Sequence, residues 1–347
     1  MKVLLHMGNY KTGTSALQQY LSEHAKEISR QGIYYGKEQK ELYFAHAFFA
    51  CAVLKQALKG QNFWAKEPKI WERIQRSGEE LLQEMVQEAR KMGCHTVVIS
   101  QEGILCELLR TLGGLWKSQF SGAYDEDEML IKYHKTMYEL LRKSFDEIEA
   151  LIFLRRQDEY LESQYKQYIK WPWKEDAVKL PEFSEFVALR PVRLHYKPVL
   201  DILAFIYGKD ALRVMGYGEK TDTVEEIIKL LKLQRKEEKT LKNSNPSLNM
   251  DATEFRRKYI KPEAIYNEEL LQVLLEYSKE HPQPELTYIK PQMWQQLKET
   301  YEKENRQIAE QYMTPASKPI PPFEWKEKTL YKGLKVEQLE EIFGLFR

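Results

Sequence analysis

The sequence predicts an α/β fold with a central parallel sheet of about five strands flanked by helices. Short, nearly unbroken apolar runs recur along the chain, and segments with helical spacing of apolar residues separate them. Unbroken apolar strands are typical of parallel sheets, because both of their faces are buried. Polar residues suited to binding anions follow three of these runs, at the edge where parallel sheets bind ligands. The runs are Val3–Met7, Gly32–Tyr35, His95–Ser100, Ile148–Leu154 and Leu212–Met215.

The first element predicted is a strand, a tight loop and a helix at the N-terminus. The apolar run ends at Gly8, and apolar residues recur at helical spacing from Ala16 onward. The loop between them offers one cation, three hydroxyls and a glycine that lets the backbone approach a ligand closely. These residues are Lys11, Thr12, Gly13, Thr14 and Ser15. Because a helix N-terminus has free N–H groups and a positive dipole end, the loop is predicted to bind phosphate or sulfate.

The remaining elements follow from the same periodicity. Helical spacing predicts helices within about 41–91, from near Asp158, around Val199 to Tyr207, and at Met250–Tyr259, Pro262–Tyr277 and Pro291–Tyr312. The stretch from Arg235 to Ser247 is charged and then rich in Asn, Ser and Pro, which predicts an exposed loop. We therefore expect a single domain over residues 1–347. It consists of an α/β core over 1–235, with a helical insertion at about 41–91, and a helical C-terminal extension over about 248–347.

Composition limits the possible partners. A hydrophobic content of 43% over 347 residues is enough for a sizeable core. Lys and Arg total 53 against 52 Asp and Glu, a formal net charge of +1. A balance of this kind does not favour a general nucleic-acid or membrane-surface binder. Any site for a polyanion must therefore be local.

Cysteine content and hydropathy indicate the compartment. The three cysteines, Cys51, Cys94 and Cys106, form no CxxC pair, which favours reduced thiols over a disulfide or zinc framework. The apolar run before Gly8 is too short for a signal-peptide core, and the sequence contains no apolar run of about eighteen residues. These observations predict a cytoplasmic protein without a transmembrane segment.

Three familiar loop motifs do not fit the N-terminal loop. A nucleoside-triphosphatase loop, GxxxxGK followed by Ser or Thr, needs a lysine after its second glycine, whereas Thr14 follows Gly13 and the lysine is Lys11. The dinucleotide pattern GxGxxG lacks its second glycine. The KTG at Lys11 and the SxxK that begins at Ser163 stand in the reverse of the order found in serine acyltransferases.

The order Lys-Thr-Gly-Thr-Ser resembles the 5′-phosphosulfate loop of sulfotransferases that use 3′-phosphoadenosine 5′-phosphosulfate (PAPS). A second signature of that family is an arginine at the end of a later strand and a serine eight residues on, which are here Arg155 and Ser163. Two motifs in the expected order are more specific than either alone. The chain is most similar to bacterial relatives of the carbohydrate sulfotransferases, over about residues 1–260. It has no counterpart of the arginine-lysine-glycine motif of the cytosolic small-molecule enzymes.

The resemblance implies a P-loop NTPase-like three-layer fold, PAPS as sulfuryl donor and no metal. Lys11 is then the catalytic cation beside the bridging oxygen, and the 5′-phosphosulfate is bound by Gly8, Lys11, Thr12, Gly13, Thr14 and Ser15. Arg155 and Ser163 hold the 3′-phosphate. Arg156 has two interpretations that the sequence leaves open: it joins this clamp, or it pairs with Glu159 on the surface.

The acceptor hydroxyl must lose a proton, so a base is expected near Lys11. Glu102 follows a predicted strand at its carboxyl end and is the first candidate; its alternative role is a carboxylate favoured by a helix dipole. His6, on the first strand, is the second candidate, with a buried, hydrogen-bonded strand histidine as its alternative. His46 and His134 are more distant candidates.

The acceptor itself is predicted only by class. The resemblance favours a sugar, glycan or lipid acceptor and no nucleic acid. The aromatic pair in Trp171-Pro172-Trp173 either borders the acceptor site or packs under a loop. Two other functions stay open: a P-loop-type nucleotide-dependent phosphotransferase, which requires ATP and magnesium, and a non-catalytic nucleotide-binding relative.

Overall fold

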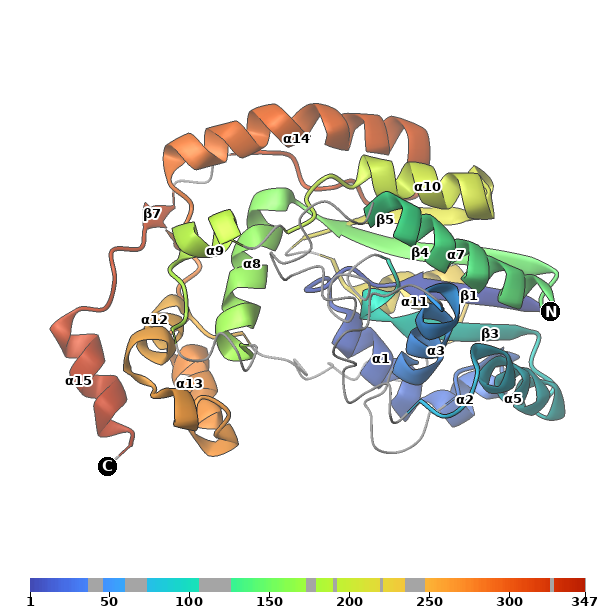
Figure 1. Cartoon of the computed structure of the whole chain (residues 1–347), viewed down its shortest axis with the longest axis horizontal. Helices are drawn as coiled ribbons and strands as arrows, with labels where there is room; N and C mark the ends of the chain where they lie inside the picture. The colour runs from blue at the N-terminus through green and yellow to red at the C-terminus, as the bar shows by residue number, and fades with distance from the viewer. Residues whose placement is uncertain are drawn as a thin grey trace. The chain divides into compact units, whose positions relative to one another are not determined.

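The computed structural model describes residues 1–36, 46–59, 74–105, 126–172, 179–189, 192–218, 221–234, 247–324 and 328–346. The chain forms two compact units, each assembled from three stretches (Figure 1). Unit 1 comprises Met1–Arg155, His195–Ser244 and Glu304–Pro321. Unit 2 comprises Arg156–Leu194, Asn245–Lys303 and Pro322–Arg347.

Unit 1 is built on a parallel five-stranded sheet with the order β2-β3-β1-β4-β5. The strands are β1 Lys2–Met7, β2 Ile33–Tyr34, β3 Thr96–Gln101, β4 Glu147–Arg155 and β5 Leu212–Tyr217. Each of the five apolar runs contains or overlaps one of them, so the predicted α/β class and parallel central sheet are confirmed. In β1, Val3 and Leu5 pack into one core and Leu4 into another, which is why the run is apolar without alternation.

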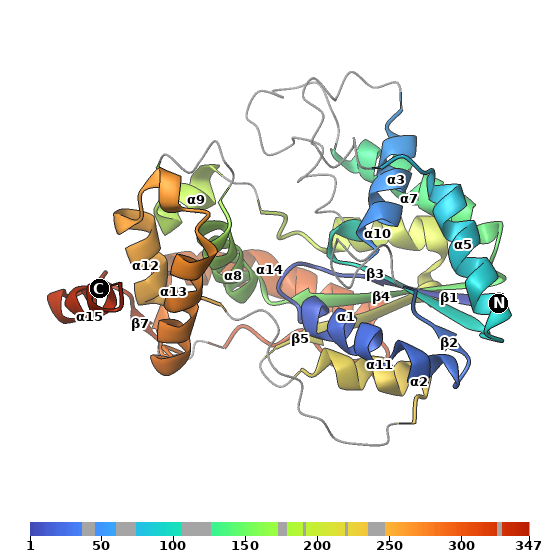
Figure 2. The same ribbon diagram turned by 90° about the horizontal axis from the view of Figure 1, so that it is seen from below.

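Helices cover both faces of the sheet (Figure 2). One face packs against α1 Thr14–Glu23, α2 Ala25–Ser29 and α11 Thr223–Leu231. The other packs against α3 Ala47–Ala57, α5 Gly78–Lys91, α7 Glu126–Arg142 and α10 Lys197–Tyr207. Unit 1 also contains two short 3₁₀ turns, η1 Glu102–Ile104 and η2 Lys209–Ala211. The predicted helical insertion contains α3 and α5, while residues 41–45 and 60–73 lie outside the described part of the chain.

The order of the strands creates a topological switch at β1. The helix that follows β1 packs on one face, whereas the helices that follow β3 and β4 within unit 1 pack on the other. Since β1 lies between β3 and β4, the loop after β1 begins where the connections diverge. Ligands of open α/β sheets bind outside the carboxyl ends of the strands at such a point. The predicted anion loop is therefore at the position that the topology favours for a ligand.

A segment near the C-terminus completes unit 1. The end of α14 (Pro291–Tyr312) and the residues up to Pro321 pack along the sheet, with Ile308 and Ile320 in the same core as α10. The backbone N–H of Gly216 in β5 donates a 2.7 Å hydrogen bond to the carbonyl of Lys318. Unit 1 thus contains residues from both the N-terminal and the C-terminal parts of the sequence.

Unit 2 is mainly helical. Its helices are α8 Gln157–Lys170, α9 Phe183–Leu189, α12 Met250–Tyr259, α13 Glu268–Glu280, the first part of α14, and α15 Val336–Gly344, with the 3₁₀ turn η3 Pro262–Ala264. Two short strands, β6 Leu286–Thr287 and β7 Thr329–Leu330, pair in parallel. The spacing predicted α12 and α14 with their observed bounds. The predicted helix at Pro262–Tyr277 is two elements, because Asn267 caps a new helix through the N–H of Leu270.

The structure bears on two of the predictions made from composition, those about the cysteines and about a transmembrane segment. Cys51 and Cys94 are buried thiols that form no disulfide among the described residues, while Cys106 lies outside that part of the chain. Among the helices of the described residues, none has the length and apolar character needed to cross a bilayer.

The contact between β5 and the segment after α14 predicts a stability effect at Gly216. A Cβ added there lies 2.0 Å from the Pro319 carbonyl oxygen, and backbone cannot yield cheaply. Gly216→Ala is expected to destabilise the protein by about 1–3 kcal/mol, measured by urea denaturation. The control is Gly344→Ala, where nothing lies within 4 Å of the added Cβ. Equal midpoints for the two variants would contradict the packing described here.

Candidate active site

The candidate site begins where β1 ends and the chain passes close to β3. The N–H of Gly8 donates to the carbonyl of Gln101 at 3.2 Å. A Cβ on Gly8 would lie 2.9 Å from the Cα of Glu102 and 2.9 Å from Oγ1 of Thr14. Only glycine permits this approach, which brings the loop against the carboxyl end of β3.

The loop has a left-handed turn at a lysine. Lys11 has φ 63°, a conformation that costs a side-chain-bearing residue roughly 1–2 kcal/mol. Two hydrogen bonds support the turn: Nη1 of Arg155 donates to the Lys11 carbonyl at 3.2 Å, and Oγ1 of Thr12 donates to the Asn9 carbonyl at 2.6 Å. Backbone strain that neighbouring contacts maintain in this way is typical of ligand-binding loops.

The N-terminus of α1 keeps its capacity to bind an anion. Gly13 is its N-cap, with φ 76°; within the described residues, no side chain caps the helix and no acidic residue stands in its first turn. Oγ1 of Thr14 is buried without a hydrogen-bond partner among the described residues. Free N–H groups, the positive dipole end and an unpaired buried hydroxyl together suit a phosphate-like ligand.

Two residues from other elements pack against Gly13. Oγ1 of Thr223 donates to the Gly13 carbonyl at 3.2 Å, and a Cβ on Gly13 would lie 3.1 Å from the Tyr217 ring. The sequence analysis did not identify either residue. A signal existed for Thr223, since Asp222 with Glu225 three residues later is a helix-start pattern. Asp222 does cap α11, accepting from the N–H groups of Val224 and Glu225.

Glu102 lies beside the loop, at the start of η1. Oγ of Ser15 donates to its Oε1 at 3.3 Å. Burial raises the pKa of the Glu102 carboxyl, and the Ser15 hydrogen bond and the positive charge of Lys11 only partly oppose this rise. The structure therefore brings together the predicted cation and the first candidate base, with a carboxyl whose pKa is shifted toward neutrality.

His6 occupies a buried strand position. Its Nδ1 lies 2.8 Å from Oγ of Ser100, which also accepts from Nε2 of Gln18 at 3.1 Å. The side chain is fully buried, and burial lowers its pKa to about 3. Nε2 of His6 has no hydrogen-bond partner among the described residues. These contacts agree with the alternative role given to His6, a neutral, buried histidine of the strand.

The two more distant histidines are buried as well. Nδ1 of His46 accepts from the N–H of Ser100 at 3.1 Å. His134 lies between the Tyr207 hydroxyl at 3.1 Å and the Leu105 carbonyl at 3.2 Å. Burial lowers the pKa of each to about 4. Both rings are therefore neutral at pH 7 and act as hydrogen-bonded parts of the core.

Arg155 ends β4 and reaches the loop. Its guanidinium lies 5.7 Å from the centre of the Tyr217 ring, in addition to its bond to Lys11. Its own carbonyl accepts from the Tyr196 hydroxyl at 2.8 Å. Arg155 belongs to unit 1, whereas Ser163 is a half-buried residue of α8 in unit 2. The pairing of these two residues on a 3′-phosphate stays a prediction.

Arg156 is buried and paired. Its Nε and Nη2 contact the Asp158 carboxylate at 2.6 and 3.0 Å, and Nη2 lies 3.2 Å from Glu159. Nη1 donates to the Pro322 carbonyl at 2.7 Å. Of the two interpretations, these contacts agree with the ion pair to Glu159, although the pair is buried rather than on the surface.

The aromatic pair after α8 is described only in part. Trp171 is 43% exposed, while Trp173 lies outside the described residues.

A comparison of the chain with protein-family models, curated proteins and solved structures finds no match. Function must therefore be argued from the residues themselves.

The buried histidines predict a pH dependence of stability. His6 has a pKa of about 3 in the folded chain against an ordinary 6.5, so the unfolded chain takes up the proton first as the pH falls. Stability is thus lost between about pH 6.5 and pH 3. When the pH falls from 6 to 5, the free energy of unfolding, measured by urea denaturation, should decrease by about 1 kcal/mol less for His6→Gln than for the wild type. An unchanged pH dependence would refute the assignment.

Proposed function

We propose that this protein transfers a sulfuryl group from PAPS to a hydroxyl or amine of an acceptor, with a carbohydrate or glycoconjugate as the favoured class. The proposal includes the finer fold assignment, a P-loop NTPase-like sandwich. It rests on the two sequence signatures, each of which lies at a strand-to-helix junction: the first between β1 and α1, the second from the end of β4 into α8.

One observation carries the proposal: the N-terminal loop combines a cation, an uncapped helix N-terminus and a neighbouring carboxylate. Lys11 has a left-handed backbone supported by Arg155, and its charge acts on the pKa of Glu102. A loop that merely connected a strand to a helix would need neither the strained lysine nor the unpaired hydroxyl of Thr14.

The proposed reaction uses positioning and charge. The acceptor oxygen attacks sulfur in line with the leaving oxygen of the 5′-phosphate, and the bond between that oxygen and sulfur breaks. Lys11 stabilises the negative charge that develops on the leaving oxygen. Glu102 accepts the proton of the acceptor hydroxyl, and its raised pKa makes it a stronger base than an exposed glutamate.

The phosphates of the donor are assigned to separate groups. In the proposal, the N–H groups at the start of α1 and the hydroxyls of Thr14 and Ser15 bind the 5′-phosphosulfate. Arg155 supplies a planar fork for the 3′-phosphate, together with Ser163. The reaction as proposed assigns no role to a metal.

Ligand binding tests the choice of nucleotide. Adenosine 3′,5′-bisphosphate at a hundred times its dissociation constant should stabilise the protein by about 2.7 kcal/mol, a rise in Tm of roughly 5 °C. ATP with magnesium should have little effect, because the lysine precedes the glycine of the loop. Differential scanning fluorimetry measures both, and the reverse order would sink the sulfotransferase proposal in favour of a phosphotransferase. As a control, Ser163→Ala should reduce the difference between the rise in Tm caused by adenosine 3′,5′-bisphosphate and the rise caused by adenosine 5′-phosphate.

Two substitutions test the chemistry. Lys11→Ala should abolish transfer while the fold is retained, and Lys26→Ala, at an exposed lysine of α2, is the matched control. Glu102→Gln should lower kcat by about 10²–10⁴-fold with a small change in KM for the donor. Transfer is measured by mass spectrometry of acceptors incubated with labelled PAPS. Full turnover by either variant would remove the assigned role.

A further inference from the structure

Unit 2 has a basic pocket that the proposed reaction does not use. Its volume is about 370 Å³, and the described residues that line it include the cations Lys179, Arg257, Lys258 and Lys261 and no carboxylate. None of the residues assigned to the sulfuryl donor lines it. The concentration of positive charge in one concave region calls for an explanation.

The cations come from different stretches of the chain. Arg257 and Lys258 lie in the last turn of α12, and Lys261 follows that helix. Basic residues at a helix C-terminus are favoured by the dipole, which explains this part of the cluster. Lys179 belongs to the segment before α9, so its place in the pocket does not follow from the sequence of α12. Its place in the same pocket therefore needs another cause.

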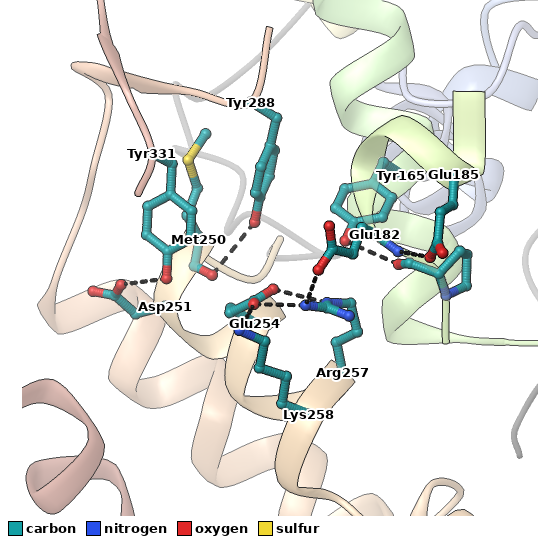
Figure 3. A network of polar contacts seen from close by, with 11 residues as sticks. Tyr165, Glu182, Glu185, Met250, Asp251, Glu254, Arg257, Lys258, Tyr288 and Tyr331 are labelled. Carbon is teal, nitrogen blue, oxygen red and sulfur yellow. Dashed lines mark hydrogen bonds and ion pairs between the residues drawn. The ribbon is translucent and has the colours of Figure 1, made fainter. Parts of the chain in front are cut away.

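Arg257 lines the pocket and is held in position by a network of polar contacts; Figure 3 shows those contacts. Its side chain is only 10% exposed, and the Glu254 carboxylate accepts from its Nε at 2.9 Å and from its Nη2 at 2.7 Å. Burial is the largest single influence and would lower the pKa of Arg257, but the hydrogen bonds to Glu254 and the interaction with its negative charge, with smaller contributions from Tyr165 and Glu182, together raise it. The guanidinium is thus charged and held in one orientation.

The carboxylates that contact this cluster are fewer than its cations. Glu254 also pairs with Nζ of Lys258 at 2.7 Å, so one carboxylate serves two cations (Figure 3). Glu182 lies 3.3 Å from Arg257 and is largely exposed. Lys179 and Lys261 make no ion pair with any described residue. Counted over the described residues, the pocket therefore keeps a net positive charge, which favours a ligand that carries more than one negative charge.

The wall that carries Lys179 is anchored in the core of unit 2. Leu180 is buried, and the hydroxyl of Tyr165 donates to the Pro181 carbonyl at 3.2 Å. Tyr259, which also lines the pocket, packs against Phe255 with ring centroids 5.5 Å apart and is 42% exposed. A fixed, partly exposed aromatic ring beside cations suits a ligand that has a ring as well as anionic groups.

We propose that this pocket binds an oligoanion whose sulfate or phosphate groups are carried on a ring, as in a sulfated saccharide or a phosphorylated nucleoside. A single inorganic anion occupies little of such a volume and engages few of the four cations. Recognition by Arg and Lys is common to sulfate and phosphate groups, so the source of the ring is decided by experiment.

Charge reversal in the pocket tests the proposal. The full chain is titrated by calorimetry at low salt with a sulfated hexasaccharide, adenosine 3′,5′-bisphosphate and sodium sulfate. K179E/K261E should weaken binding of one of the two ring-bearing ligands at least tenfold. The control K279E/K290E makes the same change in net charge at exposed lysines of unit 2 outside the pocket and should leave affinity within about twofold of the wild type.

The outcomes separate the ligand sources from each other and from the donor site. If K179E/K261E loses only saccharide binding, the ligand of the pocket is a saccharide. If K179E/K261E loses a bisphosphate site that Lys11→Ala retains, the ligand is a nucleotide. If wild type binds neither ring-bearing ligand, or if K179E/K261E and K279E/K290E behave alike, the proposal is overturned. None of these readouts depends on sulfuryl transfer.

Discussion

The pairing of β1 with β3 on one side and with β4 on the other is the constraint on which the candidate site depends. The backbone ladders of β1 align His6 with Ser100 and with Leu151, so β1 and β3 end at the same level and β4 extends beyond them to Arg155. The loop after β1 then meets Glu102 from β3 and Arg155 from β4 without any long excursion of the chain. Any change that shifted this register would move all three groups relative to one another.

The loop between β1 and α1 contains features that lower the stability of the folded chain when no ligand is bound. A left-handed lysine, a glycine N-cap and a buried, unpaired threonine hydroxyl each cost free energy in the absence of a ligand. Arg155 offsets part of this cost through the Lys11 carbonyl, and Thr223 does so through the Gly13 carbonyl. Structural features that lower stability at one edge of the sheet are expected where a binding site is preorganised.

The sequence predicted those parts of the fold that burial encodes locally. All five strands were found because a strand buried on both faces is apolar throughout, and α12 and α14 were found with their bounds because their apolar spacing is regular. Contacts between distant residues left no such signal: the bond from Gly216 to Lys318 depends on how the chain returns to β5. The same holds for Arg156, whose pairing with Glu159 one helical turn away was among the expectations, whereas its bond to the Pro322 carbonyl was not.

Glu102 and Glu254 illustrate why the environment of a carboxylate decides its role. Burial acts to raise the pKa of both Glu102 and Glu254, and both lie near cations. Glu254 accepts hydrogen bonds from Arg257 and Lys258, which outweigh burial and lower its pKa. Glu102 receives one hydrogen bond from Ser15 and the charge of Lys11, which do not outweigh burial. Glu254 is therefore suited to hold cations in place as an anion, whereas the raised pKa of Glu102 makes its carboxylate a stronger base than an exposed glutamate.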